Sequence, residues 1–250
     1  MKAIENRHSK ILEDLSRAGR MEVTALALNY QVSVVTMRKD LAELEERGLL
    51  RREQGFAILE ENDMKRRLAA NHATKCRLAK RAAQLVDDGE IVMIESGSCC
   101  ILLAEEICRT KKDVTIVTNS VFMTDYIGRM QSVRLVLLGG DYQRDSQAVV
   151  GPVTRASAQL FHVSRLFAGT DGYLSGVGFT GDNHLRVETI RNMAENAEET
   201  VILTESLKFL HRGVVPLFRA GEVGCVVTDS SAEQSVQDEL KKEGIKLMLI

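Results

Sequence analysis

Hydroxyl and basic side chains gather at the start of one predicted helix in the first sixty residues. Ser33 is a good N-cap for this helix. In the turns after it, Thr36, Arg38 and Lys39 are predicted to face away from the apolar stripe, and Val35 joins them on that side. A basic helix end can place Arg or Lys against guanine edges and Thr against a phosphate or a thymine methyl group. These five residues are therefore candidates for contacts in the major groove of DNA.

A second basic stretch follows this helix directly. Residues 49–59 carry Arg51, Arg52 and Gly55 between apolar positions, which predicts a short β-hairpin wing. Arg51 and Arg52 are candidates for phosphate contacts beside the groove. The net charge of the chain is -2, so the DNA interpretation rests on the local placement of charge. The alternative is a protein-interaction module whose charges are only solvated.

A second group of candidate residues lies after the predicted strands of the remaining chain. Residues 95–100 (Glu-Ser-Gly-Ser-Cys-Cys) follow an apolar strand and open a helix, so their backbone N–H groups could hold an anion such as phosphate. A bare turn is the alternative. Further polar and glycine-rich positions are Thr118-Asn119-Ser120, Gly139-Gly140-Asp141, Gly151-Pro152, Asp171-Gly172, Gly178-Phe179-Thr180 and Lys208-Phe209. Most would cluster at the carboxyl ends of strands, where open α/β sheets bind ligands.

The spacing of apolar residues predicts the elements that position these groups. Three helices are expected from Ile4 to before Gly19, over residues 24–30, and from after Ser33 to Gly48, and a long helix over residues 68–86. Buried-type strands then alternate with helical segments, which predicts an α/β domain with a mainly parallel sheet. The predicted strands cover residues 91–94, 114–118, 133–138, 165–169, 200–204, 222–228 and 245–250. The chain divides into a DNA-binding domain (1–60), a linker (61–75) and an α/β domain (76–250).

The composition excludes several classes of protein. No apolar run resembles a signal peptide or a membrane span, so we expect a cytoplasmic protein without membrane association. The five cysteines lack a CxxC pair and the histidines lack metal-ligand spacing, so we expect free thiols, no metal and no cofactor. Cys99 and Cys100 could be redox-active at a helix start, but buried apolar side chains are favoured. Residues 176–181 match GxGxxG without a preceding strand, which favours a ligand-covering loop over an NAD site.

These motifs together resemble the DeoR family of bacterial sugar-metabolism regulators. The resemblance to the family's winged helix-turn-helix covers residues 4–57, through Val32-Ser33, Thr36-Met37-Arg38-Lys39-Asp40-Leu41, Leu44-Glu45, Gly48-Leu49-Leu50-Arg51-Arg52 and Gly55-Phe56-Ala57. Residues 76–250 resemble the family's sugar-phosphate-sensing domain, whose fold is similar to ribose-5-phosphate isomerase. The chain departs from the family pattern at Glu95, where Asp is usual, and at Cys99 and Cys100, where Thr or Ser is usual.

The resemblance implies roles for individual residues of the α/β domain. Gly97 and Ser98 would cradle a phosphate, and Lys208 would be a cationic ligand of the effector. Thr118, Asn119 and Asp171 would face the sugar. The full set of effector-binding candidates is Glu95, Gly97, Ser98, Cys99, Thr118, Asn119, Ser120, Gly139, Gly140, Asp171, Gly178, Thr180 and Lys208.

The sequence therefore predicts a repressor of a carbohydrate-metabolism operon that binds double-stranded operator DNA and is controlled by a phosphorylated sugar or a related metabolite. We expect a homo-oligomer, a dimer or a tetramer, because groove-binding domains commonly work in symmetric pairs. No enzymatic activity is expected. The enzyme alternative is a sugar-phosphate isomerase with an attached DNA-binding module, in which Asp171 or Glu188 would be the base and Lys208 an electrostatic stabiliser.

Overall fold

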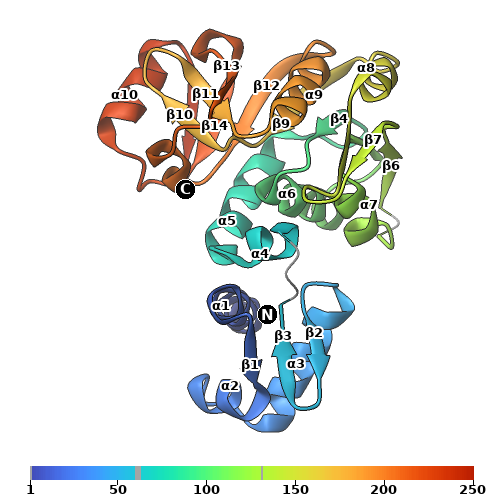
Figure 1. Ribbon diagram of the computed structural model, residues 1–250, viewed down its shortest axis with the longest axis vertical. Coiled ribbons are helices and arrows are strands. Elements are labelled where there is room, and N and C mark those ends of the chain that lie inside the picture. The colour runs from blue at the N-terminus through green and yellow to red at the C-terminus, as the bar shows by residue number, and fades with distance from the viewer. Residues whose placement is uncertain (1, 60–62, 131) are drawn as a thin grey trace. The chain divides into compact units, whose positions relative to one another are not determined.

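The computed structural model describes residues 2–59, 63–130 and 132–250. The chain forms two compact units, Met1–Ala73 and Thr74–Ile250, and each is described by itself (Figure 1). The predicted linker 61–75 begins at residues outside the described ranges. Most of its remainder is helical, because it contains α4 (Asp63–Ala69) and the start of α5 (His72–Ala82).

Short helices and a three-stranded antiparallel sheet build the DNA-binding candidate in the first unit. Its elements before residue 60 are α1 (Lys2–Ala18), β1 (Arg20–Glu22), α2 (Val23–Asn29), α3 (Val34–Glu46), β2 (Arg51–Glu53) and β3 (Phe56–Ile58). The three helices and the hairpin wing confirm the prediction from apolar spacing. The strand order is β1-β3-β2, and β1 was missed because three residues are too few to show an alternating pattern.

A buried carboxylate fastens α3 to α1. Asp40, on the inner face of α3, is 4% exposed. It accepts hydrogen bonds from Arg7 Nε at 2.7 Å and Nη2 at 3.0 Å, and His8 Nε2 lies 3.1 Å from its Oδ1. Burial alone would raise the pKa of Asp40, but the hydrogen bonds and charges of Arg7 and His8 outweigh it and hold the pKa below its usual range. This network fixes the helix that carries Arg38 and Lys39.

The prediction of one long helix over residues 68–86 is wrong. The chain breaks between α4 and α5, where Asn71 has a positive φ of 50°, and α5 gives way at Ala83 to the 3₁₀ turn η1 (Ala83–Leu85). A residue in the left-handed region ends an α-helix, and Asn tolerates that conformation better than most residues. Apolar periodicity cannot detect such a break, because the buried positions recur on both sides of it.

A seven-stranded parallel sheet forms the centre of the second unit. Its strands are β4 (Ile91–Ile94), β5 (Val114–Thr118), β6 (Val133–Leu137), β9 (Val163–Ala168), β12 (Ala197–Leu203), β14 (Cys225–Thr228) and β15 (Lys246–Leu249). All seven were predicted, although β14 begins later than expected because the chain first makes the 3₁₀ turn η3 (Ala220–Glu222). The spatial order is β15-β14-β12-β9-β4-β5-β6, and every neighbouring pair is parallel.

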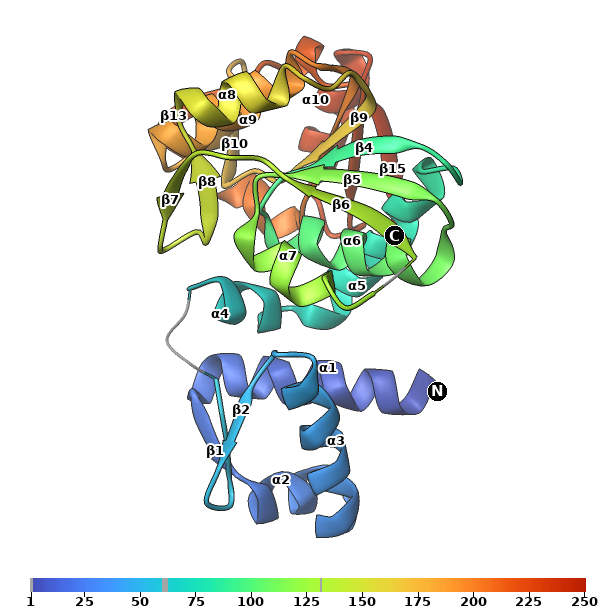
Figure 2. The same cartoon turned by 90° about the vertical axis from the view of Figure 1, so that its right-hand side faces the viewer.

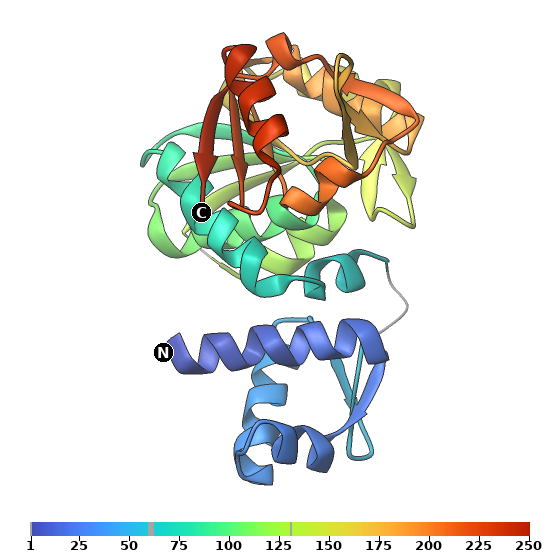
Figure 3. The same ribbon diagram turned by 90° about the vertical axis from the view of Figure 1, so that its left-hand side faces the viewer.

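Helices cover both faces of this sheet, which explains why its strands are apolar throughout. Figure 2 shows α5, α6 and α7 on one side of β4, β5 and β6, with α8 and α9 on the other. In Figure 3 the red C-terminal strand β15 lies at an outer edge of the sheet. The bounds of the remaining helical segments are α6 (Ser98–Thr110), α7 (Val121–Ile127), α8 (Pro152–Ala158), α9 (His184–Ala194), η2 (Ser206–Leu210) and α10 (Gln234–Lys242).

Two smaller sheets complete the unit, and one of them corrects a sequence prediction. They are a hairpin of β7 (Asp141–Gln143) and β8 (Ala148–Val150), and an antiparallel sheet of β10 (Gly172–Leu174), β11 (Gly178–Gly181) and β13 (Val215–Phe218). The expected ligand-covering loop over residues 176–181 is therefore wrong, because most of it is strand β11. A Cβ on Gly178 would come within 2.3 Å of the Phe218 backbone oxygen, so this glycine allows close strand packing.

We predict that Asp40→Ala lowers the free energy of opening of α3 by about 3 kcal/mol at neutral pH, because the substitution leaves Arg7 without its buried partner. Hydrogen–deuterium exchange of α3 peptides in the full chain measures the effect. Asp40 titrates below its usual pKa, so its contribution is complete above about pH 4 and is lost as the pH falls through that depressed pKa. Glu46→Ala, at an exposed position of α3, is the control. Equal exchange in both variants would contradict the anchoring role.

Candidate functional site

The outer face of α3 presents the predicted groove-contacting residues to solvent. Val35, Arg38 and Lys39 are exposed, whereas Met37 and Leu41 are buried on the opposite side. The helix begins as predicted, because Ser33 Oγ accepts the backbone N–H of Thr36 at 3.0 Å. The Thr36 hydroxyl lies 2.9 Å from the same oxygen, so Ser33 and Thr36 shape the helix start.

The two arginines of the wing have different surroundings. Arg52 donates from its backbone N–H and from Nε to the carboxylate of Glu45 on α3, both at 2.7 Å. These bonds hold the pKa of Glu45 below its usual range, and the bond from the backbone N–H has the largest effect. Arg52 therefore ties the wing to α3. Arg51 Nη2 lies 3.1 Å from Glu53, and both of these side chains are about half exposed at 52% and 50%.

Sequence reasoning missed a third arginine on this sheet. The guanidinium of Arg20 on β1 lies 3.7 Å from the ring centroid of Phe56 on β3. Such stacking holds a cation in place without removing its charge. A pairing between two short strands was needed to find this contact, and β1 has no pattern that predicts it.

The direction of strand addition in the large sheet reverses between β4 and β9. The chain builds outward from β4 to β5 and β6, then returns to place β9 on the other side of β4. At such a point the connections leave in opposite directions, and a crevice opens at the carboxyl ends of the two strands. Residues 95–98 follow β4, and residues 169–171 follow β9. The sheet topology thus marks the segment in which the sequence places its anion-binding candidates.

Glu95 links these two strand ends. Its Oε2 accepts the backbone N–H groups of Gly97 at 2.7 Å and Gly169 at 3.1 Å. Its Oε1 lies 3.3 Å from Nη2 of Arg186 on α9. Glu95 is only 1% exposed. A Cβ on residue 97 would come within 2.7 Å of Oε2, so glycine lets the carboxylate approach the turn closely.

The start of α6 joins this arrangement through main-chain groups. Gly97 is its N-cap, and no hydrogen bond from a described side chain caps the helix. Ser98, Cys99 and Cys100 are all buried. Cys100 Sγ lies 3.7 Å from the Phe167 backbone oxygen, which fits the favoured interpretation of the two cysteines as buried side chains.

The polar residues after β5 are mostly used within the fold. Thr118 Oγ1 donates to the Ile94 backbone oxygen at 2.6 Å, and Ser120 Oγ accepts the Met123 backbone N–H at 3.0 Å as the N-cap of α7. Asn119 Nδ2 donates to the Val149 backbone oxygen at 3.2 Å. Asn119 Oδ1 is buried and meets no hydrogen-bond donor among the described residues. Buried polar atoms are usually paired, so this oxygen stands out among the polar groups that follow β5.

The other effector candidates are dispersed over the second unit. Asp171, after β9, accepts the Asp182 backbone N–H at 3.0 Å. Gly178 and Thr180 belong to β11, and Thr180 Oγ1 accepts the Gly213 backbone N–H at 2.9 Å. A Cβ on Gly140 would come within 1.9 Å of Thr154 Oγ1. Gly140, next to Gly139, therefore allows close packing against α8.

A buried ion pair lies at the carboxyl end of β12, beside Lys208. Lys75 Nζ on α5 is 3.3 Å from Glu205 Oε2, and their side chains are 4% and 10% exposed. The Lys208 backbone N–H donates to the backbone oxygen of Glu205, the N-cap of η2, at 3.0 Å. Sequence reasoning missed Lys75, because a lysine on a helix is normally exposed.

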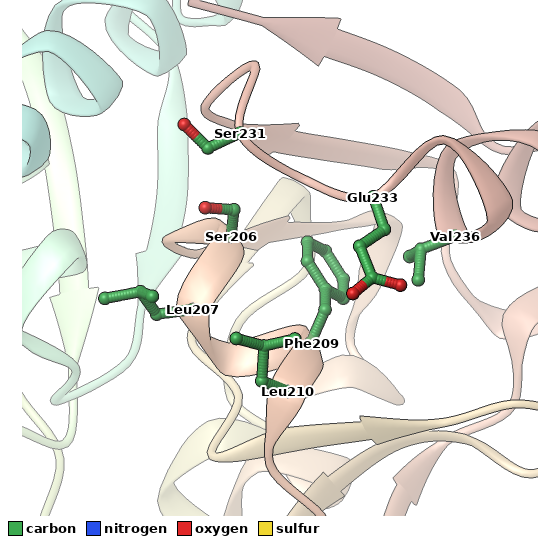
Figure 4. Close-up of a pocket in the computed structure, with 7 residues that line it drawn as sticks. All are labelled: Ser206, Leu207, Phe209, Leu210, Ser231, Glu233 and Val236. Atoms are coloured by element: carbon green, nitrogen blue, oxygen red, sulfur yellow. The ribbon is translucent and has the colours of Figure 1, made fainter.

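A small pocket lies next to η2 (Figure 4). Its volume is about 140 Å³, and it is lined by Ser206, Leu207, Phe209, Leu210, Ser231, Glu233 and Val236. None of the predicted effector residues lines it. Its largely apolar lining distinguishes this pocket from the polar strand ends at Glu95.

Family models match almost the whole chain. Residues 7–62 match the DeoR-like helix-turn-helix domain, and residues 70–230 match the DeoR C terminal sensor domain. The chain belongs to the DeoR family. The first match contains α3 and the wing, and the second contains the switch point between β4 and β9.

Named regulators resemble this DeoR-family chain along nearly their full lengths. The HTH-type transcriptional regulator UlaR of Shigella sonnei is 28% identical over 255 residues, which cover 98% of each chain. A protein of Escherichia coli O157:H7, provisionally named the aga operon transcriptional repressor, is 28% identical over 251 residues, with 98% of this chain and 93% of the relative covered.

Some of the solved structures with a distant likeness to this chain are isomerases. Ribose 5 phosphate isomerase A from Neisseria gonorrhoeae has a TM-score of 0.42 and 16% identity, over 56% of this chain and 54% of that chain. Ribose 5-phosphate isomerase a from Methanocaldococcus jannaschii has a TM-score of 0.42 and 20% identity, over 56% and 55%. The DeoR-family chain thus spans about half the length of these isomerases.

Within residues 2–59, 63–130 and 132–250, no group of three or more His, Cys, Asp or Glu side chains could hold a metal ion. Burial raises the pKa of Cys108 and of Cys225 to about 11, which disfavours their thiolates. Among the same residues, no helix has the length and apolarity needed to span a bilayer.

We predict that Lys75→Met lowers the free energy of unfolding of the sensor domain by about 3 to 5 kcal/mol, because it leaves the Glu205 charge buried without its partner. The double variant Lys75→Met/Glu205→Leu should recover most of this loss, since an apolar pair of similar volume needs no counter-charge. Chemical denaturation followed by circular dichroism measures both. Lys80→Met, at an exposed position of the same helix, is the control. No recovery in the double variant would contradict the ion-pair explanation.

Proposed function

We propose that this DeoR-family protein is a repressor of a carbohydrate-metabolism operon, that its winged helix binds operator DNA, and that a phosphorylated sugar or related metabolite controls it. The observation that carries the DNA part is the two-sided character of α3. Asp40, Met37 and Leu41 hold its inner face, while Arg38 and Lys39 reach solvent on the outer face. The regulatory names of the relatives agree with this assignment.

Within the complex, different residues would have different tasks. Arg38 and Lys39 would contact base edges in the major groove, with Val35 and Thr36 close to them. Arg51 would contact a backbone phosphate. Arg52 would contribute chiefly by holding the wing against α3, because its guanidinium is already bonded to Glu45. A homo-oligomer, a dimer or a tetramer, would present two such faces to the two halves of an operator.

The metabolite part of the proposal rests on the topological switch point between β4 and β9. Strand ends at a topological switch point commonly bind ligands, and here they carry Gly97, Ser98 and Asp171. The unmet oxygen of Asn119 lies at the end of β5, which neighbours β4. We assign the phosphate to the α6 turn and the sugar hydroxyls to the neighbouring strand ends, with Lys208 as a cationic ligand.

Helix α5 is the element we propose to transmit the ligand signal. Its first two residues belong to the first unit, where His72 Nδ1 lies 2.9 Å from Ser9 Oγ and the Ala73 N–H donates to Glu13 at 3.1 Å. Its Lys75 is held by Glu205 in the second unit. A ligand that shifts this helix would change operator affinity about 5- to 150-fold, the usual size of such coupling.

The DNA part is tested by fluorescence anisotropy on duplexes from the region upstream of the chain's own operon. Arg38→Ala should weaken binding to one specific duplex by about 1 to 3 kcal/mol, because a base contact is lost. Arg51→Ala should weaken binding to all duplexes alike. It should also reduce the slope of log affinity against log salt concentration by about one, because one phosphate contact is lost. Lys242→Ala, which removes an exposed charge from α10, is the control. An absence of specific binding at low salt would favour a protein-interaction module.

The metabolite part is tested by thermal unfolding with a panel of pentose and hexose phosphates, because a ligand that binds the folded state raises its stability. Lys208→Ala should lower the affinity for the stabilising ligand about 10-fold, as expected for the loss of a charged hydrogen bond. Lys241→Ala on α10 is the control. Unchanged stabilisation would remove Lys208 from the site. Isomerisation of a sugar phosphate by the pure protein would instead identify an enzyme.

A further inference from the structure

Arg186 is a cation at the proposed effector site that the sequence did not indicate. It lies in the first turn of α9. The Arg186 backbone N–H donates to Oδ1 of the N-cap residue Asn183 at 3.0 Å, which fixes the start of this helix. Its Nη2 reaches across to Glu95 Oε1 at 3.3 Å, and its side chain is 14% exposed. Arg186 therefore brings a positive charge from α9 to the strand ends at which β4 and β9 meet.

The carboxylate of Glu95 creates an electrostatic problem for an anionic ligand. It is buried and already bonds the N–H groups of Gly97 and Gly169 at the turn that would receive the phosphate. Two negative charges in a water-poor site repel each other strongly. A phosphate can approach this turn only if a nearby cation offsets the charge of Glu95.

Arg186 has the geometry for that task. The Gly97 N–H holds Glu95 at 2.7 Å, whereas the Arg186 contact of 3.3 Å is longer than a tight charge-assisted hydrogen bond. The main chain therefore fixes the carboxylate more firmly than the guanidinium does. A guanidinium is planar and carries five N–H donors, so it can bind a carboxylate and a phosphate oxygen together.

We propose that Arg186 is an anion-binding residue of the sensor site, which offsets the charge of Glu95 and bonds the phosphoryl group of the effector. This inference rests on the proposed function, because it takes the strand ends of β4 and β9 as the effector site. It also deepens that function. The pair makes phosphate binding depend on a side chain of α9, in addition to the main-chain groups of the α6 turn.

The experiment measures thermal unfolding of the full chain with inorganic phosphate, ribose 5-phosphate or glucose 6-phosphate, and with sodium sulfate at matched ionic strength. Arg186→Gln should lower the affinity for the stabilising phosphate compound at least about 10-fold, as expected for the loss of a charged hydrogen bond. The phosphate affinity of Arg186→Lys should lie between those of wild type and Arg186→Gln, because lysine keeps the positive charge but lacks the planar guanidinium. Glu95→Gln/Arg186→Gln should recover part of the affinity, since the repelling charge is also removed.

Arg191→Gln is the matched control on the same helix. Arg191 pairs with Glu222 at 3.0 Å and lines a separate surface hollow with Phe218 and Arg219. Its substitution should leave phosphate stabilisation at the wild-type level. Loss of stabilisation in Arg191→Gln but not in Arg186→Gln would place the anion in that hollow and overturn the proposal.

The remaining outcomes separate the inference from the proposed function. If phosphate stabilises wild type and Arg186→Gln equally, Arg186 is not part of the site, although the sensor function stands. If no phosphate compound stabilises the wild type beyond sulfate, the sensor proposal fails and the assignment of Arg186 fails with it. Circular dichroism checks folding, and the two further variants keep the test decisive if Arg186→Gln does not fold.

Discussion

One buried carboxylate holds together the two strand ends on which the sensor domain depends. Glu95 bonds the backbone N–H groups after β4 and after β9, the neighbouring strands between which the direction of strand addition reverses. Because it is also paired with Arg186, it joins the sheet to α9. A charge buried this deeply is tolerated only when hydrogen bonds and a counter-charge surround it. The same requirement fixes the shape of the α6 turn.

The fold could be predicted from the sequence wherever local periodicity and tertiary packing agree. All seven strands of the parallel sheet were found, since each is an apolar run buried on both faces. Ser33 was recognised as an N-cap because the chemistry of a cap is local. The break at Asn71 and the strand nature of β11 could not be predicted. Both depend on backbone conformation or on a distant strand, which an apolar pattern does not record.

The candidate sites were predicted less completely than the fold. The outward position of Arg38 and Lys39 followed from the helical step, whereas the bond between Arg52 and Glu45 depends on how the wing folds back on α3. Glycine-rich motifs marked the strand ends, but a motif does not show which polar groups the fold already uses. Lys75 and Arg186 were missed for a related reason, since their partners are distant in sequence.

The dependence of the α6 turn on main-chain donors has an evolutionary consequence. The N–H groups of Gly97 and Gly169 belong to the backbone, so no substitution except proline removes them. The side chains of the proposed effector site are separate from this backbone, because Asn119, Arg186 and Lys208 come from three different parts of the chain. Paralogues can therefore diverge in these side chains while inheriting an unchanged backbone cradle. At the proposed effector site, such an arrangement would let gene duplication generate regulators with new metabolite preferences in a few mutational steps.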